Sequence, residues 1–187
     1  MKIKLRFQYN SPVVLTFALA SLAALLLGSL TKGTITGKLF CVYRAPLRDP
    51  LTYLRAFLHV LGHGSWAHFT GNIMLILVVG PQLEEKYGSR KLLLAILLTA
   101  FITGLAQCIF FPGVAVLGAS GIVFMMILLA SMGGMKEGWI PLTFILVTVF
   151  YLGNEIITAV TSVDNVSQLS HIIGGICGAA LGFYMDK

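Results

Sequence analysis

The stretch Leu92–Phe111, LLLAILLTAFITGLAQCIFF, decides what kind of protein this is, because it carries no charged residue from end to end. A helix of about 20 mostly apolar residues can cross the hydrocarbon core of a bilayer, which is about 30 Å thick. The whole chain has the same character: 57% of its 187 residues are hydrophobic, 11% are charged, and the mean hydropathy is +0.90. A soluble domain usually has about a quarter of its residues charged. The composition therefore excludes a soluble globular enzyme and indicates a polytopic membrane protein.

Five more apolar segments flank this stretch. The first two of the six are separated by a long connection, residues 31–65, which contains Pro46 and Pro50. A loop of that length usually has a function or forms short helices of its own. We therefore expect an all-α protein with six transmembrane helices and a long structured first loop, in a single domain over residues 1–187. The expected spans are Pro12–Leu30, Trp66–Leu83, Leu92–Phe111, Gly118–Met132, Trp139–Val160 and Leu169–Tyr184.

The positions of Lys and Arg predict the orientation. The formal charge is +6, but the basic residues lie in short clusters between apolar runs, which does not favour a nucleic-acid partner. Cytoplasmic loops carry an excess of Lys and Arg, so we expect both termini in the cytoplasm. The first apolar run is long for a signal peptide, so we expect an uncleaved first helix. The inner group is then Lys2, Lys4, Arg6, Lys86, Arg90, Lys91, Lys136 and Lys187, and the smaller outer group is Lys32, Lys38, Arg44, Arg48 and Arg55.

This topology gathers distant polar residues at one leaflet. The second, fourth and sixth spans all begin at the outer face, and their first turns carry His68 and Asn72, Ser120, and His171, respectively. The fourth span, Gly118–Met132, is only about 22 Å long at 1.5 Å per residue, which is less than the bilayer core. We therefore expect a short central helix, with Ser120 near the floor of a water-filled cavity that opens to the outside.

The sequence Gly118-Ala119-Ser120-Gly121 suits a serine nucleophile at a helix N-terminus. Glycine lets a substrate approach the backbone, and the unpaired N–H groups of the first turn stabilise an oxyanion. His171, an ionisable residue inside a span, is the candidate base. The alternatives are a small-residue packing site capped by Ser120 and a histidine that hydrogen-bonds to a neighbouring helix.

Two further polar residues and a glycine stripe favour the same site. His68 and Asn72 are spaced i, i+4 and both donate hydrogen bonds, so they suit an oxyanion hole; the alternative is a polar link between helices. On the last span, Gly174, Gly178 and Gly182 recur every four residues, which allows close helix packing.

A metal site is the main competing interpretation of the histidines. His59 and His63 have the spacing of a zinc-protease helix motif, but Val60 stands where that motif has its glutamate, which leaves no general base. We therefore expect no metal and no cofactor.

The cysteines and one carboxylate are assigned no catalytic role. Cys41, Cys108 and Cys177 are scattered and form no C-x-x-C pair, and the latter two are expected to pack as small apolar residues. Asn154 and Glu155 lie in the outer third of the fifth span, where they either line the cavity or are solvated at the surface.

Together these residues resemble the rhomboid family of intramembrane serine proteases. The resemblance runs from Arg55 to Gly182, in the order and spacing of that family's motifs. The matching residues are Gly118, Ser120 and Gly121 of G-x-S-G; His63, His68 and Asn72 on the second span; Glu84, Gly88 and Ser89 of E-x-x-x-G-S; and His171, Gly174 and Gly178 on the last span.

The resemblance implies a serine endopeptidase with a Ser120/His171 dyad. The oxyanion would be held by the Ser120 backbone N–H and the side chains of His68 and Asn72, with Gly118, Gly121, Phe124 and Gly174 in supporting positions. Substrates would be single-span membrane proteins, cut near the outer membrane face. The fifth span and the loop over residues 110–117 would gate their entry. The minimal six-helix form is bacterial, which implies the bacterial plasma membrane.

Two positions depart from the family pattern. Leu54-Arg55 replaces a Trp-Arg pair in the first loop, and Phe124 replaces a tyrosine that packs on the catalytic histidine, keeping the ring but not the hydroxyl. One alternative function is a catalytically silent rhomboid-like protein that binds transmembrane helices. Another is a small transporter, although no inverted repeat of broken helices is present.

Overall fold

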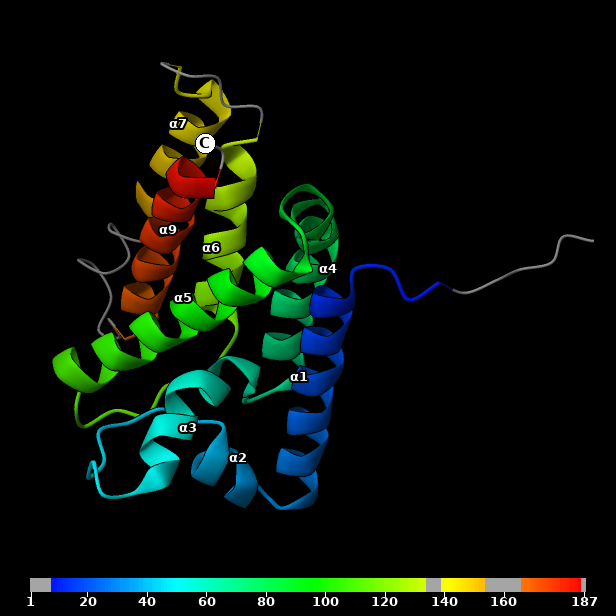
Figure 1. The fold of residues 1–187 in the computed structure, drawn as a ribbon. Helices are drawn as coiled ribbons and strands as arrows, with labels where there is room; N and C mark the ends of the chain where they lie inside the picture. Colours follow the sequence, from blue (N-terminus) through cyan, green and yellow to red (C-terminus); the bar gives the residue numbers. More distant parts are fainter. Residues whose placement is uncertain (1–7, 134–138, 154–165, 186–187) are drawn as a thin grey trace, which may run out of the picture.

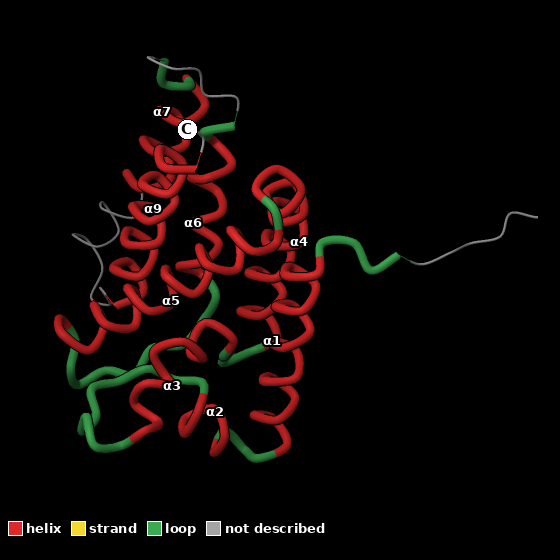
Figure 2. The backbone as a smooth tube through the Cα atoms, viewed as in Figure 1, coloured by secondary structure: helices red, strands yellow, loops and turns green. Residues whose placement is uncertain are grey.

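The computed structural model describes residues 8–133, 139–153 and 166–185, and this part of the chain is built from helices (Figures 1 and 2). The only β-type pairing among these residues is an isolated bridge between Val42 and Val116. The elements are α1 (Pro12–Leu30), α2 (Thr34–Leu39), α3 (Pro50–Leu58), the 3₁₀ turn η1 (His59–Leu61), α4 (Trp66–Tyr87), α5 (Ser89–Phe110), α6 (Ser120–Ser131), α7 (Leu142–Val147), the π-helical turn η2 (Thr148–Leu152) and α9 (Val166–Met185).

The helices follow the predicted segments, but the number of membrane spans stays a prediction. α1 begins and ends at the predicted residues, and the first loop forms α2, α3 and η1 as expected. By length and composition, α1 and α5 could each cross a membrane, and α6 is a shorter apolar helix. The described part of the predicted fifth span is α7 and η2. Asn154 and Glu155 lie outside the described residues.

The helices pack as two pairs joined by α5. Figure 1 shows α6 beside α9 and α1 beside α4, and α5 contacts members of both pairs. α4, α6 and α9 all start at the end of the bundle where the short helices of the first loop lie (Figure 1). The alternation of chain direction that the sequence predicted therefore brings their N-terminal turns together.

The central helix, α6, is short and surrounded by protein. Its side chains at Ile122, Met125, Leu128 and Leu129 are fully buried, which is expected of a helix that is apolar on every side. The predicted start at Gly118 is wrong by two residues: the helix begins at Ser120 because Gly118 has φ +132°, outside the helical region.

A carboxylate from α4 caps the start of α1. Ser11, which precedes α1, has φ 51° and makes no side-chain cap, so the first N–H groups of the helix need another acceptor. Glu84, which is buried, accepts hydrogen bonds from the backbone N–H groups of Val13 at 2.9 Å and Val14 at 3.0 Å, and from the Ser89 hydroxyl at 2.7 Å. The negative charge also complements the positive end of the helix dipole.

A buried arginine holds the first loop in place. The Arg55 guanidinium pairs with Asp49 at 3.0 Å, donates to the Lys38 carbonyl at 2.9 Å and lies over the Tyr43 ring at 4.7 Å. Leu54, at the position where the family has tryptophan, is half exposed. The position of the first loop therefore depends on the contacts of Arg55 rather than on the side chain of Leu54.

We expect Glu84→Ala to lower the free energy of unfolding by about 3 kcal/mol, because it leaves two N–H groups at the start of α1 without their charged acceptor. The thermal unfolding midpoint in detergent micelles measures this loss. Glu85→Ala, an exposed neighbour on the same helix, is the matched control. Equal midpoints for the two variants would contradict the capping role.

Candidate functional site

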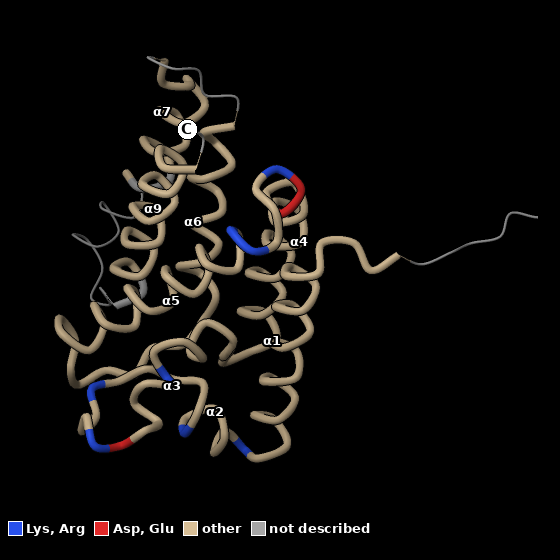
Figure 3. The backbone as a smooth tube through the Cα atoms, viewed as in Figure 1, with Lys and Arg blue, Asp and Glu red and all other residues tan. Residues whose placement is uncertain are grey.

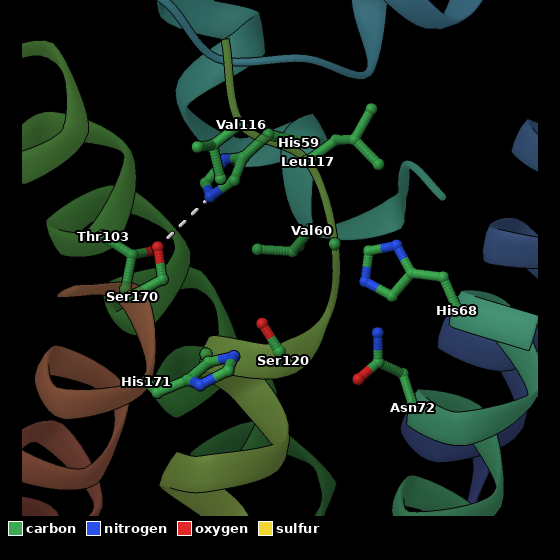
Figure 4. A pocket seen from close by; sticks show the side chains of 12 residues that line it. His59, Val60, His68, Asn72, Thr103, Val116, Leu117, Ser120, Ser170 and His171 are labelled. Carbon is green, nitrogen blue, oxygen red and sulfur yellow. Dashed lines mark hydrogen bonds between the residues drawn. The ribbon is translucent and has the colours of Figure 1, made fainter. Parts of the chain in front are cut away.

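A cavity of about 410 Å³ lies where the first turns of α4, α6 and α9 meet η1 (Figure 4). The structure brings all four predicted site residues into its wall. The lining residues are His59, Val60, His68, Asn72, Thr103, Val116, Leu117, Gly118, Ser120, Gly121, Ser170 and His171. The cavity is therefore built from segments that are more than 100 residues apart in the chain.

Ser120 lies between the other polar side chains. In Figure 4 the His171 ring is on one side of Ser120, and His68 and Asn72 face it from the opposite side. Ser120 is the first residue of α6, so the N–H groups of the first helical turn point toward the cavity end of the helix. This arrangement places a nucleophile, a base and several hydrogen-bond donors around one space.

The turn before Ser120 requires glycine. A Cβ at Gly118 would lie 2.7 Å from His68 Nε2, and the φ of +132° is one that residues with a side chain rarely adopt. The Gly118 N–H donates to the His59 carbonyl at 3.0 Å, which ties this turn to the first loop. The backbone just before the serine is thus fixed, and the His68 ring packs closely against it.

His171 is oriented by an aromatic ring from α6. The rings of Phe124 and His171 are stacked, with centroids 4.5 Å apart and planes inclined by 11°. Phe124 is one helical turn after Ser120, so these two residues lie on the same face of α6. The phenyl ring makes this contact without the hydroxyl of the family's tyrosine.

Glycines let the backbones of α6 and α9 touch. A Cβ at Gly174 would collide with the Gly121 carbonyl, and one at Gly178 would collide with the Met125 carbonyl. One turn nearer the C-terminus, Gly182 faces only the side chain of Met132. The predicted glycine stripe is therefore the surface along which the helices that carry Ser120 and His171 meet.

The Asn72 amide is positioned by a histidine of the first loop. His63 Nδ1 lies 3.1 Å from the Leu61 carbonyl, which can only accept, so Nδ1 carries the proton and Nε2 accepts from Asn72 Nδ2 at 3.3 Å. Burial and the neighbouring His68 lower the pKa of His63 to about 4, which keeps this tautomer neutral. The contact fixes the amide so that its nitrogen faces the cavity end of α4.

Three further residues, His59, Thr103 and Ser170, line the cavity and were not predicted from the sequence. His59 Nδ1 lies 3.2 Å from the Arg55 carbonyl and Nε2 lies 3.4 Å from the Thr103 hydroxyl (Figure 4). Burial lowers the pKa of His59 to about 4. The spacing of His59 to His63 singled out His59 in the sequence, but only as part of a zinc motif that Val60 argues against.

The described residues provide no metal centre. No three His, Cys, Asp or Glu side chains converge within this part of the chain. Each of His59 and His63 uses one ring nitrogen on a backbone carbonyl. Cys41 and Cys177 are buried, Cys108 is half-buried, and all three are free thiols.

Comparison with known proteins places these features in a family. Residues 50–187 match the family model described as the Rhomboid domain, and this match confirms the resemblance seen in the motifs. A curated relative, RHOMBOID-like protein 4 of Arabidopsis thaliana, is 27% identical over 135 residues. The alignment covers 66% of this chain and 32% of the relative, so the chain spans about a third of that protein's length.

We expect Gly174→Ala to destabilise the protein by about 1–3 kcal/mol, because its Cβ forces the backbones of α6 and α9 apart. Gly182→Ala is the control, since its Cβ meets only the flexible Met132 side chain while alanine favours the helix by up to about 1 kcal/mol. Thermal unfolding of the two variants in micelles measures the difference. A Gly174→Ala protein as stable as Gly182→Ala would contradict the proposed backbone contact.

Proposed function

We propose that this chain, which belongs to the rhomboid family, is an intramembrane serine endopeptidase that cuts single-span membrane proteins near the outer membrane face. The observation that carries the proposal is the shared cavity, in which Ser120 lies between His171 and the pair His68 and Asn72. A catalytic serine needs a base on one side and donors for the oxyanion on the other. The four residues supply both requirements.

In the proposed reaction, Ser120 Oγ attacks the scissile carbonyl carbon while His171 takes the hydroxyl proton. The tetrahedral intermediate collapses, the peptide C–N bond breaks, and His171 returns the proton to the leaving amine. Water then attacks the acyl-enzyme ester and gives a proton to His171. The ester C–O bond breaks, the new carboxyl group is released, and His171 returns the proton to Ser120 Oγ. No cofactor takes part in any step.

The oxyanion would be stabilised by three donors. They are the Ser120 backbone N–H at the start of α6, the His68 ring and the Asn72 side-chain amide. The helix N-terminus adds partial positive charge at the same place. The substrate chain must lie against the serine in an extended form for its carbonyl to be reached.

The dyad has no acidic third member in this proposal, and Phe124 performs part of that role. Its ring stacks on His171 and restricts the rotation of the imidazole. Gly174, one turn after His171 on the same helix, keeps α9 against α6.

We further propose that the chain forms one six-helix domain in the bacterial plasma membrane, with both termini in the cytoplasm and the cavity opening outward. The distribution of Lys and Arg supports this orientation. The hydrogen bonds that the backbone N–H groups of Val13 and Val14 donate to Glu84 support a common domain for α1 and the rest of the bundle. The loop over residues 110–117 and the fifth span would admit the substrate.

We expect Ser120→Ala and His171→Ala each to abolish cleavage of a model single-span substrate by the purified protein in liposomes, because each variant lacks one member of the dyad. Gel analysis of the substrate fragments measures the activity. Ser131→Ala, at the other end of α6, is the matched control and should cleave at the wild-type rate. Equal cleavage by wild type and Ser120→Ala would contradict the mechanism, and absence of cleavage by both would favour the silent binding protein.

We expect Asn72→Ala to lower kcat by about 10- to 1000-fold, because it removes one donor from the oxyanion hole. Thr70→Ala, which changes an exposed hydroxyl on the same helix, should leave kcat unchanged. Single-turnover kinetics in the same liposomes measures both variants, and an unfolding midpoint confirms that they fold. An unchanged kcat for Asn72→Ala would contradict its assignment as a donor.

A further inference from the structure

A second cleft lies between the first loop and the last turns of α5, and its lining residues differ from those of the proposed catalytic cavity. Its volume is about 460 Å³, within the range of small-molecule sites, about 300–1,000 Å³. Most of its wall is apolar, and Arg44 is its one charged lining residue. The lining residues are Arg44, Ala45, Leu47, Thr52, Tyr53, Ala56, Phe101, Gly104, Leu105, Cys108 and Ile109.

The wall contributed by α5 is a stripe that faces out of the bundle. Phe101, Leu105 and Ile109 recur every four residues, and 41%, 47% and 59% of their surfaces are exposed. Between them, Gly104 lets the loop approach: a Cβ there would lie 3.0 Å from the Ala56 carbonyl oxygen. The loop and the helix thus form two sides of a groove that is open at the surface of the molecule.

The cations at this groove have no carboxylate to pair with among the described residues. Arg44 and Arg48 are both exposed. Asp49, the only acidic residue in this loop, is bound by Arg55 at 3.0 Å. The other described acidic residues, Glu84 and Glu85, lie at the opposite end of α4. Figure 3 shows the basic segments of the loop between α2 and α3, near the C-terminal end of α5.

An apolar groove in a bilayer selects a ligand only if the ligand also has a polar end. Lipid chains are as apolar as leucine, so contact with the groove alone gives little preference for one lipid over another. Arginine, in contrast, offers a planar set of N–H donors that bind phosphate in a charge-assisted manner. A molecule with a phosphate at one end and a hydrocarbon chain at the other matches both parts.

We propose that this cleft binds an anionic phospholipid, with the lipid phosphate at Arg44 and Arg48 and an acyl chain between the loop and α5. In the orientation predicted from the positive-inside rule, both arginines lie on the outer side. Basic residues are less common on that side, so their presence needs an explanation. A bound lipid supplies the missing anion and fastens the loop to the bundle. The proposal concerns binding and does not depend on proteolytic activity.

Native mass spectrometry of the purified protein in a non-ionic detergent, titrated with dioleoyl-phosphatidylglycerol or dioleoyl-phosphatidylcholine, tests the proposal. We expect wild type to retain phosphatidylglycerol at least tenfold more tightly than phosphatidylcholine. The double variant Arg44→Gln/Arg48→Gln should bind phosphatidylglycerol about 30-fold more weakly. The matched control Lys32→Gln/Lys38→Gln removes the same charge from the same loop and should retain wild-type binding.

Two further arms separate a built site from general attraction. Cys108→Trp fills the groove while leaving both arginines, and should also weaken retention of phosphatidylglycerol. Inorganic phosphate at millimolar concentration should not displace the lipid. Equal losses in the two double variants, wild-type binding by Cys108→Trp, full displacement by free phosphate, or no preference for phosphatidylglycerol would each overturn the proposal.

Discussion

The backbones of α6 and α9 lie in direct contact because α9 has glycine at the two points where they approach most closely. Gly174 faces the Gly121 carbonyl and Gly178 faces the Met125 carbonyl. Neither gap has room for even one methyl group. In a bilayer there is no hydrophobic gain from bringing two apolar helices together, so close packing has to hold them. Ser120 and His171 stand at the first turns of these two helices, and their meeting depends on this contact.

Two buried charged side chains of this apolar chain are held by specific partners. An unpaired buried charge or N–H group is costly, and more so in hydrocarbon than at a protein surface. Glu84 meets the free N–H groups of α1, and Arg55 meets Asp49 and the Lys38 carbonyl. These links lie at opposite ends of the bundle and connect the first helix and the first loop to the rest.

The first loop acts as a support for the proposed catalytic residues. His63 holds the Asn72 amide, and the carbonyl of His59 holds the Gly118 turn that leads into Ser120. Both histidines are kept neutral by burial, which lowers the pKa of each to about 4. A loop that had only a connecting function would not need such buried polar residues.

Local patterns in the sequence predicted the elements better than the contacts between them. The bounds of α1 follow from one apolar run without charged residues. The grouping of Ser120, His171, His68 and Asn72 follows from the alternating direction of successive spans. The start of α6 differs from the prediction because the φ of Gly118 is a property of the folded turn, not of its composition.

Contacts across long stretches of chain could not be predicted in this way. Glu84 reaches residues 70 positions away, and no periodicity connects them. The pairing of His63 with Asn72 crosses a turn whose geometry depends on the loop, so the sequence did not predict it. The groove at Arg44 exists only because Gly104 admits the Ala56 backbone. The places of Asn154 and Glu155 lie outside the described residues.

The most direct test of the dyad is covalent labelling with a fluorophosphonate, which loses fluoride when an activated serine attacks its phosphorus. The protein in micelles is treated with the probe, and the site of modification is found by peptide mass spectrometry. The proposed mechanism predicts labelling at Ser120 in wild type and a large loss of labelling in His171→Ala. Equal labelling of Ser120 in both proteins, or labelling elsewhere in the chain with Ser120 unmodified, would contradict it.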